Sequence, residues 1–161
     1  MLRYIGVICI FFFAFYAIYS YERYQRMKAL QGDAFLSLLQ FILCEMRGLG
    51  RPMGECLAEF KSEALERCGF LPALRESGAP EASYRRLEAG LCLPPELSPI
   101  LANVFARLGR TSRMEEQRHL AAEIARAEAV LFREKELQKG RLRLCRTLAT
   151  AGAMGLVILL L

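Results

Sequence analysis

The chain has 161 residues, of which 54% are hydrophobic and 24% charged, and its net charge is +5. Its mean hydropathy of +0.22 is high for a soluble domain whereas its charged fraction is ordinary for one, so lipid-facing and water-facing parts are both expected. One histidine, one aspartate and the lack of a GxxxxGKS/T loop in the sequence argue against a His-rich metal site, a catalytic triad and that type of ATP-binding loop. We therefore expect no enzyme, no cofactor, no metal and no small-molecule substrate.

The first predicted element is a membrane-spanning helix over residues 4–21. The run from Tyr4 to Tyr19 has no charge. As a helix extended to Tyr21 it comes close to the roughly 30 Å thickness of a bilayer's hydrocarbon core. Tyrosines crowd its two ends, at the headgroup level that amphipathic rings favour. A cleaved signal peptide is the alternative, but only Arg3 precedes the run, and bulky rings stand where a small-residue cleavage site belongs.

Apolar residues at helical spacing predict one helical domain over residues 22–143. The first span is expected to run unbroken into a helix that includes Phe35 and ends at Gly48. The apolar stripe of that helix continues with Leu38, Leu39, Ile42, Leu43 and Met46. A second amphipathic helix is expected to end near Gly69 and Pro72. Its buried face consists of Met53, Cys56, Leu57, Phe60, Ala64 and Leu65.

The proline-rich segment that follows is expected to hold one short helix over residues 80–91 between irregular connectors. Ser98 and Pro99 are then predicted as the N-cap and first turn of a helix that Gly109 ends. The buried face of this helix consists of Leu101, Val104, Phe105 and Leu108.

One long helix is predicted from Ser112, which has capping-box form with Glu115, because no proline or glycine interrupts the chain before Gly140. Its inward stripe consists of Leu120, Ile124, Ala127 and Leu131. Residues 133–143 are polar on most faces, which is typical of a solvent-bridging or partner-bound helix. We expect this part to act as a stalk that holds the domain away from the membrane.

The last predicted element is a second transmembrane helix over residues 144–161. The run from Leu148 to Leu161 has no charge. Its helical length of about 21 Å lies between that of a spanning segment and that of a buried core helix. Gly152 and Gly155 would let another helix approach closely in lipid, so they are candidates for helix packing in the membrane. A flexible joint at this point is the open alternative.

Basic residues flank both predicted spans on the side of the central domain. They are Arg23, Arg26, Lys28, Arg133, Lys135, Lys139, Arg141, Arg143 and Arg146. Because Lys and Arg near span ends stay preferentially in the cytoplasm, we expect the central domain there and both termini outside. The same placement favours anionic membrane lipid over nucleic acid as the partner of the positive charge.

The six cysteines form no CxxC motif and no Cys/His pairing at metal-binding spacing. In a cytoplasmic domain they are expected to be free thiols. Four of them are interpreted as small core residues, namely Cys44, Cys56, Cys68 and Cys92.

Arginine supplies eighteen of the twenty-two basic residues, and several arginines gather at the predicted reversal before the long helix. Arginine suits fixed, bidentate contact with carboxylates and phosphates. The candidate partner surface consists of Arg85, Arg86, Arg107, Arg110, Arg113 and His119. A solvated basic face is the alternative for the arginines, and a hydrogen-bonded structural histidine is the alternative for His119. Glu45 could pair with His119 or with an arginine, and the sequence leaves that open.

Three segments together carry a family resemblance over essentially the whole chain. They are "EMRGLGRPMGECL" from Glu45, "VFARLGRTSRMEEQRHLAAEI" from Val104, and the charged helix that leads into the terminal "GLVILLL". The most specific part is Leu108 and Gly109 followed at fixed distance by Gln117 and His119. With these features the chain resembles the stage III sporulation protein AB family of endospore formers. Ser112 departs from that pattern, since aspartate is expected there.

The resemblance implies an integral membrane protein of the mother cell, within the channel complex that joins mother cell and forespore during engulfment. Its cytoplasmic helical bundle would be similar to the platform domains of type II secretion and type IV pilus systems. In those systems the platform couples a cytoplasmic ATPase to the membrane machinery, so the implied partners are the sporulation ATPase and other channel subunits. A membrane-tethered helical adaptor or signalling protein is the alternative, because it fits the bare architecture equally well.

Overall fold

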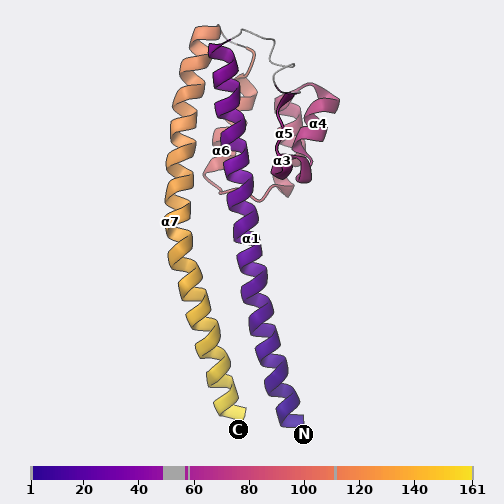
Figure 1. Ribbon diagram of the computed structural model, residues 1–161, viewed down its shortest axis with the longest axis vertical. Coiled ribbons are helices and arrows are strands. Elements are labelled where there is room, and N and C mark those ends of the chain that lie inside the picture. Colours follow the sequence, from indigo (N-terminus) through magenta and orange to yellow (C-terminus); the bar gives the residue numbers. More distant parts are fainter. Residues whose placement is uncertain (1, 49–56, 58, 111, 161) are drawn as a thin grey trace. The chain divides into compact units, whose positions relative to one another are not determined.

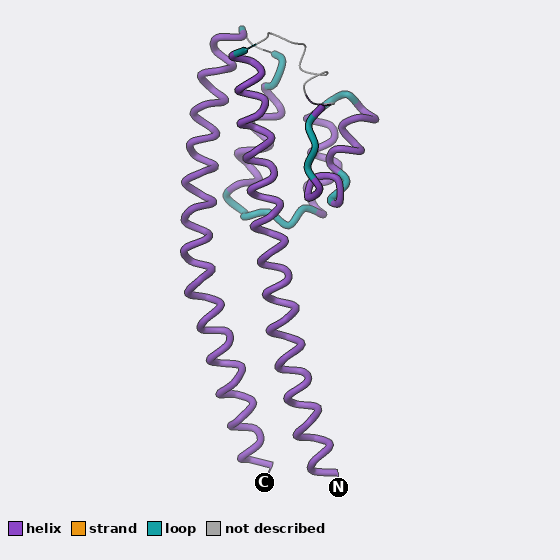
Figure 2. Tube along the Cα trace, in the orientation of Figure 1, coloured by secondary structure: helices purple, strands orange, loops and turns teal. Residues whose placement is uncertain are grey.

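The computed structural model describes residues 2–48, 57, 59–110 and 112–160, and all regular elements in these residues are helices (Figures 1 and 2). In chain order they are α1 (Leu2–Arg47), α3 (Glu63–Arg67), α4 (Phe70–Ser77), α5 (Pro80–Leu87), the 3-10 helix η1 (Glu88–Gly90), α6 (Leu97–Arg107) and α7 (Arg113–Leu160). The predicted all-α class is therefore confirmed for the described residues.

The chain divides into two units, and each is considered by itself. Unit 1 consists of Met1–Met27 and Glu134–Leu161, and unit 2 consists of Lys28–Arg133. Helix α1 continues unbroken from the predicted first span into the helix of Phe35, as expected. Helix α7 continues through Gly140, because a single glycine in a helix interior costs only about 1 kcal/mol.

The predicted apolar stripes of the two long helices line the hydrophobic core of unit 2. In α1 the side chains of Phe35, Leu38, Leu39 and Ile42 are fully buried. In α7 the buried apolar side chains are Leu120, Ile124, Ala127 and Leu131. Both stripes are confirmed, since residues three or four positions apart share one helix face. The short helices complete the unit, with α3 packed on α4, α4 on α5 and α5 on α6.

Aromatic rings from four helices meet at the centre of this core, and Phe35 of α1 is their common partner. Its ring centroid lies 5.0 Å from that of Phe70, 6.1 Å from that of Tyr84 and 6.3 Å from that of Phe105. All three pairs have the edge-to-face geometry that ring quadrupoles favour. The cluster therefore links α1 to α4, α5 and α6.

Helix α4 was missed by the sequence analysis, which predicted an irregular connector there. Pro72 lies in the first turn of α4, where its missing N–H breaks no helical hydrogen bond. Gly69 precedes the helix with a positive φ of 83°, so the chain can turn sharply between α3 and α4. Leu71 and Leu74 are buried, and their packing stabilises a helix that is too short to form alone.

The prediction that Ser98 caps a helix was also wrong. Helix α6 begins at Leu97 with Glu96 as its N-cap, two residues before the predicted cap. The Ser98 hydroxyl instead donates to Oε1 of Glu88 at 2.6 Å, and it also lies 3.0 Å from the Tyr84 hydroxyl. The Tyr84 hydroxyl donates to the Ser98 carbonyl at 3.2 Å. The Ser98 hydroxyl therefore contacts side chains that are distant in the sequence and does not cap the helix.

The interpretation of four cysteines as core residues was wrong for Cys44, which is exposed. Cys68 and Cys92 are half-buried, and Cys56 lies outside the described residues. Burial raises the pKa of the Cys68 thiol. Cys44 lies on α1 two residues after the buried Ile42, so its side chain points to the opposite, exposed side of the helix.

In unit 1 the start of α1 and the end of α7 form an antiparallel helix pair, and the two chain ends lie at the same end of this pair (Figure 1). The Gln138 side-chain amide donates to Oε1 of Gln25 at 3.3 Å, and Gln25 is buried. Ala14, Ile18 and Tyr21 of α1 are half-buried at coiled-coil spacing from Gln25. A polar pair in such a seam fixes the register of the two helices.

In unit 2 the long helices approach closely at Gly32. A Cβ atom at this position would lie only 2.6 Å from Cδ2 of Leu131 and 3.6 Å from Cδ2 of Leu97. Both leucines are buried, so neither has free space to move into. The missing side chain of Gly32 therefore sets the spacing between α1 and α7 here.

We expect Gly32→Val to lower the free energy of unfolding by about 1–3 kcal/mol relative to Gly140→Val, because it overpacks the contact with Leu131. The two substitutions change helix propensity equally. Nothing lies within 4 Å of a Cβ atom at Gly140, so the comparison isolates packing. Thermal unfolding of the full chain in detergent micelles, followed by far-ultraviolet circular dichroism, measures the difference. Equal stability of the two variants would contradict the close approach.

Burial, with a smaller effect from the Glu88 carboxylate, raises the pKa of Tyr84 above its ordinary value of about 10, and the Ser98 hydrogen bond only partly opposes this. The fold thus binds the proton more tightly than the unfolded chain, and stability falls as pH rises through the raised pKa. The variant Tyr84→Phe lacks the hydroxyl and should be about 1 kcal/mol less stable than wild type at neutral pH. Because phenylalanine does not ionise, its stability should not show the fall at high pH. The stability gap between wild type and variant should therefore narrow from about pH 9 to about pH 11 in denaturant titrations. A constant gap would contradict the prediction.

Candidate functional site

The reversal between α6 and α7 carries most of the predicted partner surface. Gly109 has a positive φ of 81°, the left-handed conformation expected of a glycine that ends a helix. Its backbone N–H donates to Oε1 of Glu116. Helix α7 begins at Arg113, directly after Ser112, as the capping-box prediction requires, and the Glu115 contact of that box stays a prediction. The Glu116 carboxylate comes within hydrogen-bond distance of the Gly109 N–H only because the chain reverses direction between α6 and α7.

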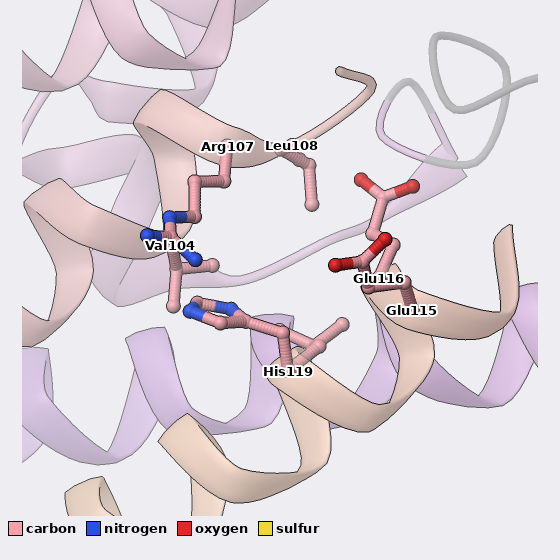
Figure 3. A pocket seen from close by; sticks show the side chains of 7 residues that line it. Val104, Arg107, Leu108, Glu115, Glu116 and His119 are labelled. Carbon is pink, nitrogen blue, oxygen red and sulfur yellow. The ribbon is translucent and has the colours of Figure 1, made fainter. Parts of the chain in front are cut away.

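A small cavity of about 60 Å³ lies at this reversal (Figure 3). Its lining consists of the apolar Val104, Leu108 and Leu120 and the charged or polar Arg107, Glu115, Glu116 and His119. In Figure 3 the side chains of Arg107 and His119 lie on one side and those of the two glutamates on the other. This volume suits ordered water or one side chain of a partner and is too small for an organic cofactor.

His119 faces a buried carboxylate. Its Nε2 lies 3.7 Å from Oε1 of Glu123, whose side chain is only 6% exposed. The same oxygen accepts hydrogen bonds from Arg126 at 3.0 Å and from Asn103 at 3.4 Å. A buried carboxylate needs such partners, so this contact favours the structural reading of His119. Glu123 could not be predicted from the sequence, because nothing in its local pattern distinguishes it from an exposed glutamate.

Arg113 and Gln117 bind the same backbone oxygen at the end of α1. The carbonyl of Met46 accepts from Nε of Arg113 at 3.0 Å and from the side-chain amide of Gln117 at 2.7 Å. Carbonyls in a last helical turn have no partner within the helix, so these donors cap α1. The contact joins two of the segments that carry the family resemblance. It gives Arg113 an internal structural role that local sequence could not reveal.

Arg85 and Arg110 are brought together by one carboxylate. Glu81 at the start of α5 lies 2.8 Å from Arg85 and 2.7 Å from Arg110. Both arginine side chains remain largely exposed, but part of their charge is compensated. The pairing ties α5 to the segment that follows α6.

Arg86 and Arg107 differ from the other predicted arginines. Both are exposed, and no carboxylate in the described part of the chain lies within ion-pair distance of either. The structure therefore separates the candidate surface into arginines with internal partners and two arginines whose charge is uncompensated by the described residues of unit 2.

Gly152 and Gly155 are exposed in unit 1, and nothing lies within 4 Å of a Cβ atom built on either. Their small-residue surface is thus not used for contact with the other described residues. Their predicted role in packing against another membrane helix stays a prediction. Over the described ranges, no group of three or more His, Cys, Asp or Glu residues could hold a metal ion.

Among the described residues one helical stretch, Phe11–Arg47, is long and apolar enough to cross a membrane. With the arginine-rich helical unit 2, this is consistent with an all-helical, membrane-associated protein. The chain belongs to the stage III sporulation protein AB family, whose family model matches residues 3–161. The resemblance stated from the sequence is confirmed, and the role of the protein is in sporulation. No curated protein and no solved structure matches the chain.

Removal of the cap on α1 should destabilise unit 2, whereas removal of an uncompensated arginine should not. We expect the double variant Arg113→Ala/Gln117→Ala to lose about 1–3 kcal/mol of unfolding free energy, because the Met46 carbonyl loses both donors. Arg86→Ala should stay within about 0.5 kcal/mol of wild type. Denaturant unfolding of the full chain in micelles measures both. Equal effects of the cap variant and Arg86→Ala would show that the cap contributes nothing.

Proposed function

We propose that the protein is a non-enzymatic membrane platform subunit of the channel between mother cell and forespore, and that unit 2 docks a cytoplasmic ATPase. The observation that carries the proposal is the combination of membership in a sporulation family with a long apolar helical stretch, Phe11–Arg47, that begins in unit 1. A membrane anchor and a charged helical domain are what a platform needs in order to connect a soluble motor to membrane machinery.

The exposed surface of α1 in unit 1 supports insertion into a membrane. Its large exposed side chains are Phe11, Phe12, Phe13, Phe15, Tyr16, Tyr19 and Tyr24. At about 100° per residue these positions point in most directions around the helix. A helix that is apolar all round is stable only in a protein core or in lipid, and in unit 1 these side chains meet no core.

The register of the helix pair supports a second crossing by α7. Gln25 lies opposite Gln138. Because the two antiparallel helices rise by the same distance per residue, residue 142, four positions after Gln138, lies level with residue 21, four positions before Gln25. Residues 144–160 then run along the same length as residues 3–19, about 25 Å of helix. Leu144, Leu148 and Met154 in this part of α7 are more than half exposed, as expected of a lipid-facing surface. The short apolar run at the end of the sequence is thus the last part of a longer spanning helix.

Basic residues on the unit 2 side of both crossings support a cytoplasmic location of unit 2, with both termini outside. Arg86 and Arg107 are the favoured docking residues, because their charge is uncompensated within the described part of unit 2. An acidic patch on the ATPase would supply carboxylates for bidentate contact. Arg110 and Arg113 contribute less in this proposal, since each has an internal partner.

The test is affinity purification of the full-length protein in detergent from sporulating cells, with partners identified by mass spectrometry. Wild type should recover the sporulation ATPase and other channel subunits. The variant Arg86→Glu/Arg107→Glu should lose the ATPase by about tenfold or more while it retains the membrane subunits, because two contacts become repulsive.

The matched control is Arg47→Glu/Arg118→Glu, which changes charge equally at two other exposed arginines of unit 2 that have no carboxylate partner among the described residues. It should recover the ATPase as wild type does. Recovery of the bait alone, from cells that contain the partners, would contradict the platform function and favour a membrane-tethered adaptor. Equal loss in both variants would contradict the assigned docking residues and indicate a general effect of charge.

A further inference from the structure

We propose that four arginines of unit 1 form a binding site for the headgroups of anionic phospholipids. The site, called here the basic band, consists of Arg23, Arg26, Arg141 and Arg143, and all four side chains are exposed. The inference rests on the proposed membrane insertion of unit 1, and its partner is a lipid rather than a protein subunit.

The basic band lies at one level of the helix pair. The hydrogen bond between Gln25 and Gln138 fixes the register, so Arg23 lies nearly level with Arg141. The four residues then occupy about 9 Å along the helix axes at about 1.5 Å per residue. Arginine side chains are long enough to bring four guanidinium groups at this spacing into one headgroup layer.

The neighbours of the band match a membrane interface. On α1, Tyr19 lies just outside the band and Tyr24 lies between Arg23 and Arg26. Their side chains are 58% and 52% exposed, and tyrosine rings favour the headgroup level. On the side toward the chain termini, Phe15 and Leu144 expose 73% and 63% of their surface. A charged layer beside an apolar one suits a lipid, which has both, whereas nucleic acid would leave the apolar side in water.

The charge of the band is available for a ligand. No carboxylate of the described residues lies within ion-pair distance of any of the four arginines. The nearby Lys139 differs, since it pairs with Glu136 at 2.9 Å, and Glu22 within the band has a contact of its own. Guanidinium groups bind phosphate oxygens in bidentate geometry, and an anionic lipid adds net charge that phosphatidylcholine lacks. The band should therefore select phosphatidylglycerol over phosphatidylcholine.

The test uses the full chain in micelles of an uncharged detergent. Phosphatidylglycerol and phosphatidylcholine with identical acyl chains are added in equal amounts, and bound lipids are counted by native mass spectrometry. Wild type should prefer phosphatidylglycerol by about tenfold, and added salt should reduce this preference. The variant Arg23→Gln/Arg26→Gln/Arg141→Gln/Arg143→Gln should bind the two lipids nearly equally.

The control variant Arg85→Gln/Arg86→Gln/Arg107→Gln/Arg118→Gln removes the same charge from unit 2 and should keep the wild-type preference. Equal binding of both lipids by wild type would overturn the proposal, as would an unchanged preference in the band variant or an equal loss in the control. Displacement of phosphatidylglycerol by a short single-stranded oligonucleotide would also overturn it, in favour of nucleic acid. Membrane insertion itself is tested separately, because a protein that alkaline carbonate extracts from membranes fails the proposed function whatever its lipid preference.

Discussion

The contact of the Phe35 ring with Phe70, Tyr84 and Phe105 is the interaction on which unit 2 depends. Helices of five to eight residues, such as α3, α4 and α5, do not form alone in water. They exist here because their apolar faces are buried against a long helix, and edge-to-face pairs add about 0.5–1.5 kcal/mol each beyond that burial. Tyr84 fixes α5, so the positions of Glu81, Arg85 and Arg86 on its outer face follow from the core.

The long elements could be predicted from the sequence because their stripes repeat over many turns. In α1 and α7 the apolar positions recur often enough to identify both the helix and its inner face. Helix α4 offers only Phe70, Leu71 and Leu74 around a proline, too few to distinguish a helix from a connector. Ser98 had the right local chemistry for a cap, but Tyr84 and Glu88 compete for its hydroxyl only once the core has formed.

The candidate site could be located from the sequence but not resolved into roles. Arg86 and Arg113 are the same residue type in similar local settings, and their difference comes from a backbone carbonyl 67 positions before Arg113 in the chain. Composition thus indicates where positive charge gathers. Only tertiary contacts show which part of it stabilises the fold and which part a partner could use.

The seam between α1 and α7 has a different chemistry in each unit, and this difference supports different surroundings. In unit 2 the buried positions of α1 hold Phe35, Leu39 and Ile42. In water the hydrophobic effect stabilises the packing of such side chains. In unit 1 the corresponding positions hold Ala14, Ile18, Tyr21 and Gln25, smaller or more polar residues. Lipid is as apolar as leucine and gives no hydrophobic drive between helices, so close approach and hydrogen bonds must hold such a pair. A single pair of continuous helices can therefore carry a water-type interface in one unit and a lipid-type interface in the other, and unit 1 has the aromatic surface exposed that the second environment requires.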